Sequence, residues 1–305
     1  MTMMPQFPVY IVSKGRAENG LTARFLARDN VPFRLVIEPQ EEEAYAQHFG
    51  RERLLLLPFS NLGQGSIPAR NWIWEHAKSE GHKRHWILDD NIHNFYRYYE
   101  GKRIRIAAGA SFKVIEDFTE RYTNIAISGM NYTTFVGLSA NNSKSVMPPF
   151  YLNTHVYSCI LILNELPHRW RGRYNEDTDL CLQVLSDKWC TVAFNAISQH
   201  KAATMTMKGG NTDKLYKGDG RLEMARSLER QWPYAVTVKR RFQRPQHVVH
   251  NAWQKFDTPL IRRDDIDWAA IENQDYPIKL VQVKDTIKSE RIRRILKKNQ
   301  DDTQA

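Results

Sequence analysis

The sequence predicts an α/β fold built on a mostly parallel, Rossmann-like sheet flanked by helices. Short apolar runs alternate with segments of helical spacing over the first ninety residues, a pattern typical of parallel sheets covered on both faces. Charged clusters follow the first and fourth apolar runs, at strand ends where such sheets bind ligands. The composition of the 305 residues is globular, with 42% hydrophobic and 26% charged residues, so the chain can bury a sizeable core.

The first half of the chain reads as four strands separated by helices. Apolar, β-branched runs predict strands, and apolar residues three or four apart predict helices. The predicted strands are 9–12, 33–37, 54–57 and 86–88, and the predicted helices are 19–29, 40–48 and one through Trp72 and Trp74. A loop at 61–66 precedes the third helix.

The second half is more mixed and ends in a basic extension. Strands are predicted at 102–107, 125–128, 157–163 and 191–194, helices at 109–122, 176–187 and 221–231, and loops at 136–149 and 203–219. Gly209 and Gly210 give the second loop hinge freedom to close over a ligand, although an ordinary exposed loop is equally compatible. A change to basic runs near residue 235 predicts a domain at 1–235 and a basic C-terminal extension at 236–305.

Charge and cysteine content limit the classes of partner and compartment. Lys and Arg number 44 against 34 Asp and Glu, a net charge of +10 that favours polyanionic partners such as nucleic acid or nucleotide phosphates. The three cysteines, Cys159, Cys181 and Cys190, form no CxxC pair, so neither a disulfide framework nor a zinc knuckle is indicated. Without a signal-peptide pattern or a run of about 20 apolar residues, we expect a cytoplasmic protein with no membrane partner.

An acidic cluster, Asp89-Asp90-Asn91, directly follows the apolar run at 86–88. Two adjacent carboxylates at a strand end repel each other and lose solvation, and a cation between them relieves both costs. Hard oxygen ligands favour Mg²⁺ or Mn²⁺, which usually share their shell with substrate phosphates. The motif therefore predicts a metal site, with a plain strand-ending turn as the open alternative.

A second acidic motif, Glu176-Asp177, opens a predicted helix after Asn175. Asn is a good N-cap, and carboxylates in the first turn stabilise the helix dipole. With Asp179, however, the motif has three carboxylates in four residues, more than capping needs. Crowding raises the proton affinity of a carboxylate, which suits a general base. Glu176 and Asp177 are therefore candidate catalytic residues, and capping alone is the alternative.

Isolated polar residues near strand ends complete the candidate site. Arg clamps phosphates with two hydrogen bonds and Lys acts as a point charge, whereas a lone histidine becomes a metal ligand only beside other ligands. The candidates are Ser13, Lys14, Arg16, Arg70 and His200. No Walker loop, no G-x-G-x-x-G after a strand and no HExxH or GxSxG occurs, which argues against P-loop, dehydrogenase and common hydrolase chemistry.

Taken together, the motifs resemble a GT-A glycosyltransferase, and more closely the TET-associated glycosyltransferases of bacteriophages and related elements. The resemblance rests on three phrases, Pro8 to Arg16, Ile67 to Asn71 and Trp86 to Ile92, and covers roughly residues 7–205. One departure is Asn91, which stands where many GT-A enzymes have a carboxylate. The metal contact is therefore placed on Asp90 first and on Asp89 second.

The resemblance implies a GT-A fold and a hexosyltransferase that uses a UDP-linked sugar as donor. It implies that the donor pocket is lined by Ser13, Lys14, Arg16, Arg70 and Asp89. It implies that Mn²⁺ or Mg²⁺ is held by Asp89, Asp90, Asn91 and His200. Asp177, supported by Glu176, would take the proton from the acceptor hydroxyl in an inverting reaction.

For the acceptor, the resemblance implies 5-hydroxymethylcytosine or a related hydroxymethylated pyrimidine in DNA, which agrees with the basic charge. Trp170, Arg171 and Arg173 are candidate acceptor contacts or, equally, parts of a surface loop. Two other functions stay open. One is a GT-A glycosyltransferase that acts on a protein or a saccharide, and the other is a non-enzymatic, basic DNA-binding protein on a GT-A-like scaffold.

Overall fold

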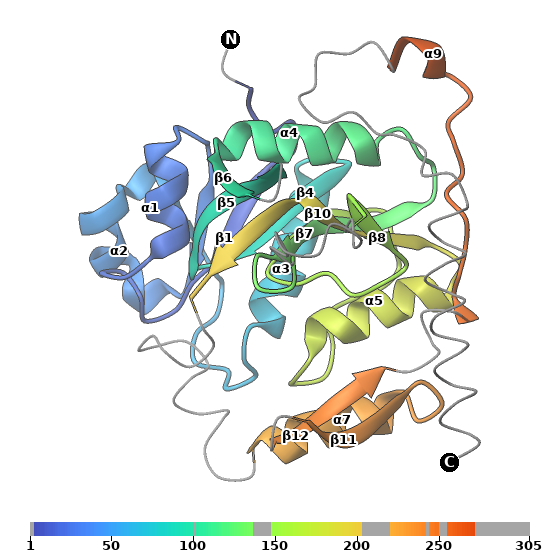
Figure 1. Cartoon of the computed structure of the whole chain (residues 1–305). Coiled ribbons are helices and arrows are strands. Elements are labelled where there is room, and N and C mark those ends of the chain that lie inside the picture. The colour runs from blue at the N-terminus through green and yellow to red at the C-terminus, as the bar shows by residue number, and fades with distance from the viewer. Residues whose placement is uncertain are drawn as a thin grey trace. The chain divides into compact units, whose positions relative to one another are not determined.

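A computed structural model gives the fold and describes residues 3–99, 102–136, 148–202, 220–241, 244–249 and 255–271 (Figure 1). The chain divides into two compact units, Met1–Asp264 and Asp265–Ala305. The first unit contains the sheet, and the helix described in the second is α9 (Trp268–Ile271). Within the described ranges, no helix is long and apolar enough to cross a membrane. The predicted loop 203–219, with Gly209 and Gly210, lies outside these ranges.

A ten-stranded mixed sheet forms the core of the first unit. Its strands are β1 (Val9–Val12), β2 (Arg34–Ile37), β3 (Leu54–Leu56), β4 (Arg84–Asp89), β5 (Ile92–Tyr99), β6 (Lys102–Ile106), β7 (Ile125–Tyr132), β8 (Phe150–Leu152), β9 (Cys159–Leu163) and β10 (Cys190–Lys201). The spatial order is β3-β2-β1-β4-β9-β7-β10-β5-β6, and β8 pairs with β10.

The predicted parallel arrangement is confirmed for the first four strands. β3, β2, β1 and β4 pair in parallel, as do β7 and β10. By contrast, β9 runs antiparallel between β4 and β7, and β5 and β8 run antiparallel to β10. Parallel strands need a crossover of a dozen or more residues. The two residues between β4 and β5 instead reverse the chain, so the sheet is more mixed than the sequence predicts.

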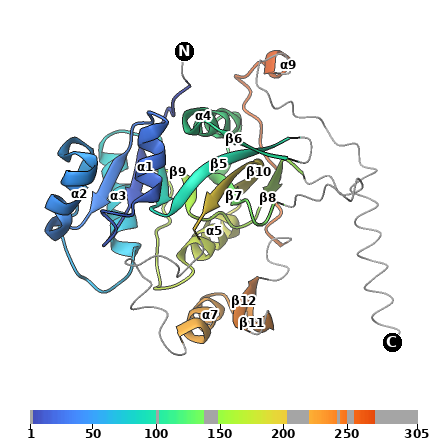
Figure 2. The same cartoon turned by 60° about the vertical axis from the view of Figure 1, so that its left-hand side comes forward.

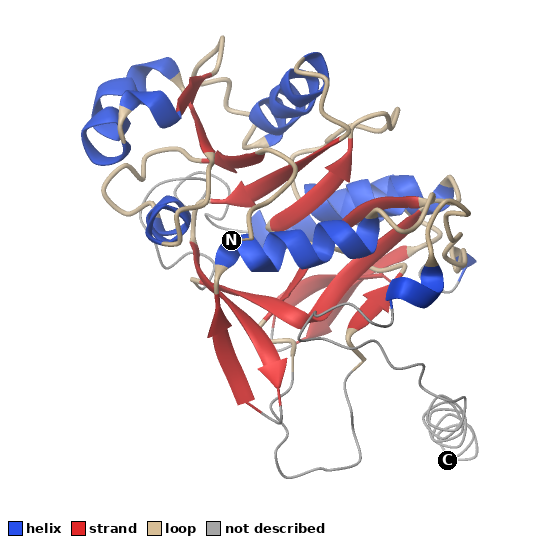
Figure 3. Cartoon of the chain, turned by 90° about the horizontal axis from the view of Figure 1, so that it is seen from above, coloured by secondary structure: helices blue, strands red, loops and turns tan. Residues whose placement is uncertain are grey.

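Helices cover both faces of the sheet (Figures 1 and 2). They are α1 (Leu21–Arg28), α2 (Glu42–Phe49), α3 (Ile67–Ser79), α4 (Ala108–Thr119) and α5 (Glu176–Ser186), with short 3₁₀ turns η1 (Pro39–Glu41) and η2 (Arg51–Arg53). α1 and α4 pack on β5, whereas α3 packs on β1 and β4 and α5 packs on β10. Seen from above, the strands lie between layers of helix (Figure 3).

Strand β4 shows how the two faces are built. Trp86 is fully buried and its ring lies 4.8 Å from that of Phe112 in α4. Ile87, next along the strand, joins the core cluster of Trp74 in α3 and Leu180 in α5. Successive side chains of a strand point to opposite faces. Asp89, which ends β4, and Asp90, which follows it, accordingly have different side-chain partners.

A small second layer follows the large sheet in the first unit. Helix α7 (Gly220–Gln231) precedes a hairpin of β11 (Val236–Arg241) and β12 (Arg244–Val249). Leu228, Trp232 and Val236 form a common core with Leu182 of α5. The predicted boundary at 235/236 falls between α7 and β11, which share this core, and it stays a prediction.

Candidate active site

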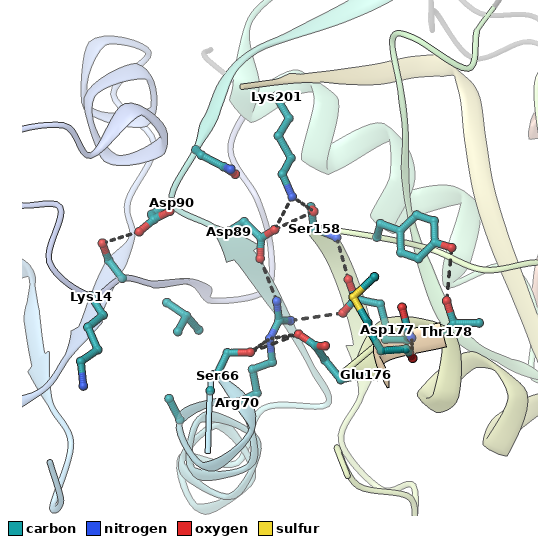
Figure 4. Close-up of a pocket in the computed structure, with 18 of the residues that line it drawn as sticks. Lys14, Ser66, Arg70, Asp89, Asp90, Ser158, Glu176, Asp177, Thr178 and Lys201 are labelled. Carbon is teal, nitrogen blue, oxygen red and sulfur yellow. Dashed lines mark hydrogen bonds and ion pairs between the residues drawn. The ribbon is translucent and has the colours of Figure 1, made fainter. Parts of the chain in front are cut away.

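A pocket of about 700 Å³ lies at the edge of the sheet where β1, β2, β4, β7 and β10 end (Figure 4). Its lining includes nine residues predicted from the sequence: Ser13, Lys14, Arg16, Arg70, Asp89, Asp90, Asn91, Glu176 and Asp177. Because the carboxyl ends of parallel strands meet at one edge, segments far apart in the chain converge there.

The turn after β4 is held by one residue of α1. Thr22 Oγ1 donates a hydrogen bond of 2.6 Å to the carbonyl oxygen of Asp89 and accepts one of 2.9 Å from the amide of Ile92. The amide of Thr22 donates to the carbonyl oxygen of Asp90 at 3.1 Å. Thr22 is fully buried. These three bonds fix the backbone that carries the acidic cluster.

Asp89 accepts hydrogen bonds from three side chains. Arg70 Nη2 lies 2.7 Å from Oδ1, and Lys201 Nζ and Ser158 Oγ each lie 2.7 Å from Oδ2. Burial favours the neutral acid, but Lys201 and Arg70 outweigh it and hold the pKa of Asp89 well below its ordinary value. Asp89 is therefore an ionised carboxylate between two cations.

Asp90 has an entirely different set of partners. Ser13 Oγ donates to its Oδ2 at 2.8 Å, and Arg16 forms an ion pair with Oδ1. The side chain of Asp90 is 7% exposed, against 24% for Asp89. The two carboxylates share no partner among the described residues, and the cation expected between them stays a prediction. Asp89 is the more exposed of the two, although the sequence places the metal contact on Asp90 first.

Arg70 joins the acidic cluster to the start of α5. The residue is buried in α3, and its guanidinium stacks 4.6 Å from the Trp170 ring. While Nη2 binds Asp89, Nη1 lies 3.6 Å from Asp177 Oδ1 and Nε lies 4.0 Å from Glu176 Oε1. One cation thus faces three carboxylates from two segments of the chain.

Asp177 combines an oxygen that accepts no hydrogen bond with a raised pKa. Its Oδ1 is buried and has no hydrogen-bond partner in the described part of the chain, although Arg70 Nη1 lies 3.6 Å away, and its Oδ2 lies 3.4 Å from the amide of Ser158. Burial, opposed by the charge of Arg70 and reinforced by the charges of Glu176 and Asp89, raises the pKa of Asp177 to about 7. A carboxylate that titrates near neutral pH and opens to a pocket suits proton transfer.

Asn175 precedes α5 but does not cap it through its side chain. Its backbone is left-handed, with φ of 56°, a conformation that Asn tolerates. The side-chain Nδ2 donates instead to the carbonyl oxygen of Met224 in α7 at 2.7 Å. Asp179, the third carboxylate, is buried and binds Arg171 and Trp232. Of the three carboxylates of this motif, Glu176 and Asp177 line the pocket, together with Asn175 itself, and Asp179 does not.

His200 lies apart from the other predicted residues. Its Nδ1 is 3.1 Å from Thr133 Oγ1, its ring lies near those of His93 and Tyr96, and it is not among the residues that line the pocket. Lys201, the next residue, lines the pocket instead. Strand β10 has an irregularity between the two residues. The geometry does not support His200 as a ligand beside Asp89, and Lys201 is the residue that sequence reasoning missed.

The predicted nucleotide-binding residues gather where β1 ends. Lys14 Nζ lies 2.6 Å from both carboxylate oxygens of Glu38, which follows β2. Ser13 Oγ lies 2.7 Å from the Tyr45 hydroxyl, which accepts a hydrogen bond from the amide of Arg16. Glu38 was not predicted, although a carboxylate directly after a buried parallel strand is a recognisable signal. This side of the pocket therefore offers donors and acceptors to a polar ligand.

The three residues considered as acceptor contacts, Trp170, Arg171 and Arg173, pack against other side chains. Trp170 is buried under Arg70, and Arg171 forms an ion pair of 3.0 Å with Asp179. The Arg173 guanidinium lies 5.8 Å from the ring of Tyr174. None of the three belongs to the described lining of the pocket.

Comparison with known proteins identifies the family of this chain. The family model described as TET-Associated Glycosyltransferase matches residues 7–210, which include all ten predicted site residues. No curated protein matches the chain. A solved structure assigned as a nucleotide-diphospho-sugar transferase from Desulfovibrio desulfuricans G20 is similar at a TM-score of 0.37 and 10% identity, covering 75% of this chain and 96% of that one. The family match spans two thirds of the sequence, and the chain is therefore a glycosyltransferase of the TET-associated glycosyltransferase family.

Proposed function

We propose that this pocket transfers a sugar from a UDP-sugar to the hydroxymethyl group of 5-hydroxymethylcytosine, or of a related pyrimidine, in DNA. One observation carries the proposal. Asp177 lines the pocket with a pKa raised to about 7, and its Oδ1 accepts no hydrogen bond from the described residues although it lies 3.6 Å from the fixed cation of Arg70. A base and a cationic site for a leaving diphosphate are the two parts that glycosyl transfer to a hydroxyl requires.

The donor fits the side of the pocket formed by β1 and β2. Glu38 lies after the second parallel strand, the place where related sheets hydrogen-bond a ribose hydroxyl. Lys14 and Arg16 line the same pocket, where their cationic side chains can bind phosphate oxygens. We assign nucleotide binding to Ser13, Lys14, Arg16 and Glu38, and diphosphate binding to Arg70 and Lys201.

The residues after β4 also fit a divalent cation that binds together with the donor. No group of three or more histidine, cysteine or acidic side chains able to hold a metal occurs in the described ranges. Mg²⁺ and Mn²⁺, however, are usually held by one or two carboxylates together with substrate phosphates. Asn91 Oδ1 is buried without a hydrogen-bond partner in the described structure, and Asp89, which lines the same pocket, is partly exposed. These two residues would hold the cation.

The balance of charges in the pocket supports the binding of a divalent cation. The described lining carries five basic side chains, Lys14, Arg16, Arg70, Lys201 and Arg244, and five acidic ones, Glu38, Asp89, Asp90, Glu176 and Asp177. The lining is thus balanced before a diphosphate brings in further negative charge. When bound, a divalent cation supplies Lewis-acid stabilisation of the leaving diphosphate.

The chemical step then follows from the positions of Asp177 and Arg70. The acceptor hydroxyl oxygen forms a bond to the anomeric carbon while its proton passes to Asp177. The bond from that carbon to the diphosphate oxygen breaks, and UDP leaves with its charge facing Arg70 and Lys201. A single displacement of this kind inverts the anomeric configuration. Arg70 also keeps Asp177 and Glu176 at a fixed separation from Asp89.

A direct assay tests the proposal. The protein is mixed with Mn²⁺, a panel of UDP-sugars and oligonucleotides that contain cytosine, 5-methylcytosine or 5-hydroxymethylcytosine, and the mass added to the DNA is measured. We expect one sugar mass on hydroxymethylated DNA alone, and none with Asp177→Asn. Release of UDP with a protein or saccharide acceptor, but no mass on DNA, would move the acceptor elsewhere. DNA binding without turnover of any donor would reject an enzymatic role.

A further inference from the structure

One wall of the pocket comes from the hairpin that follows the large sheet. Arg244, Pro245, Gln246 and His247 of β12 line the pocket together with Met224 of α7. These residues lie beyond residue 210, where the family match ends. The wall is therefore an addition to the part of the chain that carries the donor-binding motifs.

The hairpin wall is tied to the helix that carries the general base. Trp232 Nε1, which follows α7, donates to Asp179 Oδ1 in the first turn of α5 at 2.7 Å. Asn175 Nδ2 binds the carbonyl oxygen of Met224, and Val236 of β11 shares a buried core with Leu182 of α5. The wall therefore has a fixed relation to the first turn of α5, where Asp177 opens to the pocket.

The charges on this wall differ from those on the donor side. Four of the five basic side chains in the described lining, Lys14, Arg16, Arg70 and Lys201, form an ion pair with an acid. For the fifth, Arg244, the described residues provide no ion pair, and the side chain is exposed. Arg244 is thus the lining cation whose charge is available to an anionic ligand.

A second exposed cation lies on the same face of the hairpin. Lys239 of β11 is directly opposite Gln246 of β12, and opposite residues of an antiparallel pair share a face. Arg244 and Gln246 are two residues apart on β12 and also share it. Lys239 and Arg244 therefore form a short basic row that runs from the surface to the pocket. A row of cations fits a chain of phosphodiesters, whereas the single diphosphate of a donor fits the cluster around Arg70.

We propose that the β12 wall is the acceptor subsite, and that Arg244 and Lys239 hold the phosphodiester backbone of a nucleic acid so that its hydroxyl faces Asp177. The inference rests on the proposed glycosyl transfer to DNA. Backbone contacts of this kind position a nucleic acid without reading its sequence. Gln246, on the same face, is placed to hydrogen-bond the nucleotide that enters the pocket.

The test compares Lys239→Ala/Arg244→Ala with a matched control, Lys78→Ala/Lys102→Ala, which removes the same charge from exposed positions outside the pocket. Binding to a hydroxymethylcytosine oligonucleotide is measured over a series of salt concentrations, together with UDP binding and the KM of each substrate. Thermal melting confirms that both variants are folded.

We expect the first variant to raise the KM for DNA at least tenfold, with unchanged UDP affinity. Each lost phosphate contact lowers the slope of log affinity against log salt by about 0.9, so two contacts lower it by about 1.8. If the wild type transfers sugar to DNA but the Lys239→Ala/Arg244→Ala variant has the same KM for DNA and the same salt slope as the control, the acceptor subsite is overturned and the proposed function stands. A wild type that transfers sugar only to other acceptors would overturn both proposals.

Discussion

Lys201 Nζ lies 2.7 Å from Asp89 Oδ2, so the last residue of β10 and the last residue of β4 form an ion pair inside the pocket. Burial disfavours the charged lysine, but the Asp89 carboxylate raises its pKa above the ordinary value. The pair is therefore charged at neutral pH, and Lys201 supplies a fixed cation to the site.

Replacement of Lys201 tests this role. In Lys201→Met, Asp89 keeps Arg70 but loses one of its two cations, so we expect unfolding free energy to fall by about 1–3 kcal/mol and kcat to fall at least tenfold. Lys201→Arg keeps the charge and restores most of both. His200→Ala, in the neighbouring residue, is expected to cost less activity than Lys201→Met. An equal or larger loss in His200→Ala would return the ligand role to the histidine.

The raised pKa of Asp177 predicts the pH dependence of the reaction. A base must be deprotonated to accept a proton, so kcat/KM is expected to fall as the pH drops below about 7 and to level off above it. The nearby Glu176 charge raises the pKa of Asp177, and Glu176→Gln should therefore move the midpoint to lower pH. Asp177→Asn should reduce kcat by about 10²–10⁴. A midpoint that does not move in Glu176→Gln would show that another group titrates.

Because Asp89 and Asp90 have different partners, we expect replacement of Asp89 to reduce activity and replacement of Asp90 to reduce mainly stability. Asp89→Asn should lower activity with Mn²⁺ at least a hundredfold, because this carboxylate lines the pocket and is proposed to hold the cation. Asp90→Asn mainly removes the partner of Arg16 and should lower the unfolding free energy by about 1–3 kcal/mol. Activity with and without a chelator, measured beside denaturant unfolding, separates the two effects. Loss of metal response in Asp90→Asn alone would restore the order predicted from the sequence.

Replacement of Gly129 in β7 by alanine is expected to destabilise the fold without removing a side chain of the site. A Cβ at this position would lie 2.2 Å from the carbonyl oxygen of Cys159 in β9 and 2.6 Å from Val156 Cγ1. The first contact is with backbone, which cannot move aside, so Gly129→Ala should cost at least about 2 kcal/mol. Gly81→Ala, with φ of 77° and open space around it, should cost about 1 kcal/mol. Equal denaturant midpoints for Gly129→Ala and Gly81→Ala would contradict the close approach of β7 and β9.

Much of this site follows from local sequence. The apolar runs predict β1, β2 and β4, and parallel strands bring the ends of these runs to one edge. Arg70 and Asp177 both lie in helices that the sequence predicts, α3 after β3 and α5 after β9. The two-residue period of β4 also indicates, in retrospect, that Asp89 and Asp90 diverge.

Other parts of the site depend on pairings between distant segments. Whether His200 or Lys201 enters the pocket is set by the register of β10 against β5 and by the irregularity at residue 200, since a shift of one residue reverses a side chain. No local pattern specifies that register. The hairpin wall depends likewise on the packing of α7 and β11 against α5, and basic runs alone did not distinguish it from an exposed tail.

The three hydrogen bonds that Thr22 makes to the turn after β4 have a consequence for the energetics of binding. Fixing the backbone of one residue costs about 1–2 kcal/mol of conformational entropy. Because α1 holds Asp89, Asp90 and Ile92 through hydrogen bonds of the fold itself, that entropy is lost during folding, and donor binding does not have to order the turn. The turn is a preorganised template, and the affinity for the donor is correspondingly less opposed by the loss of chain freedom.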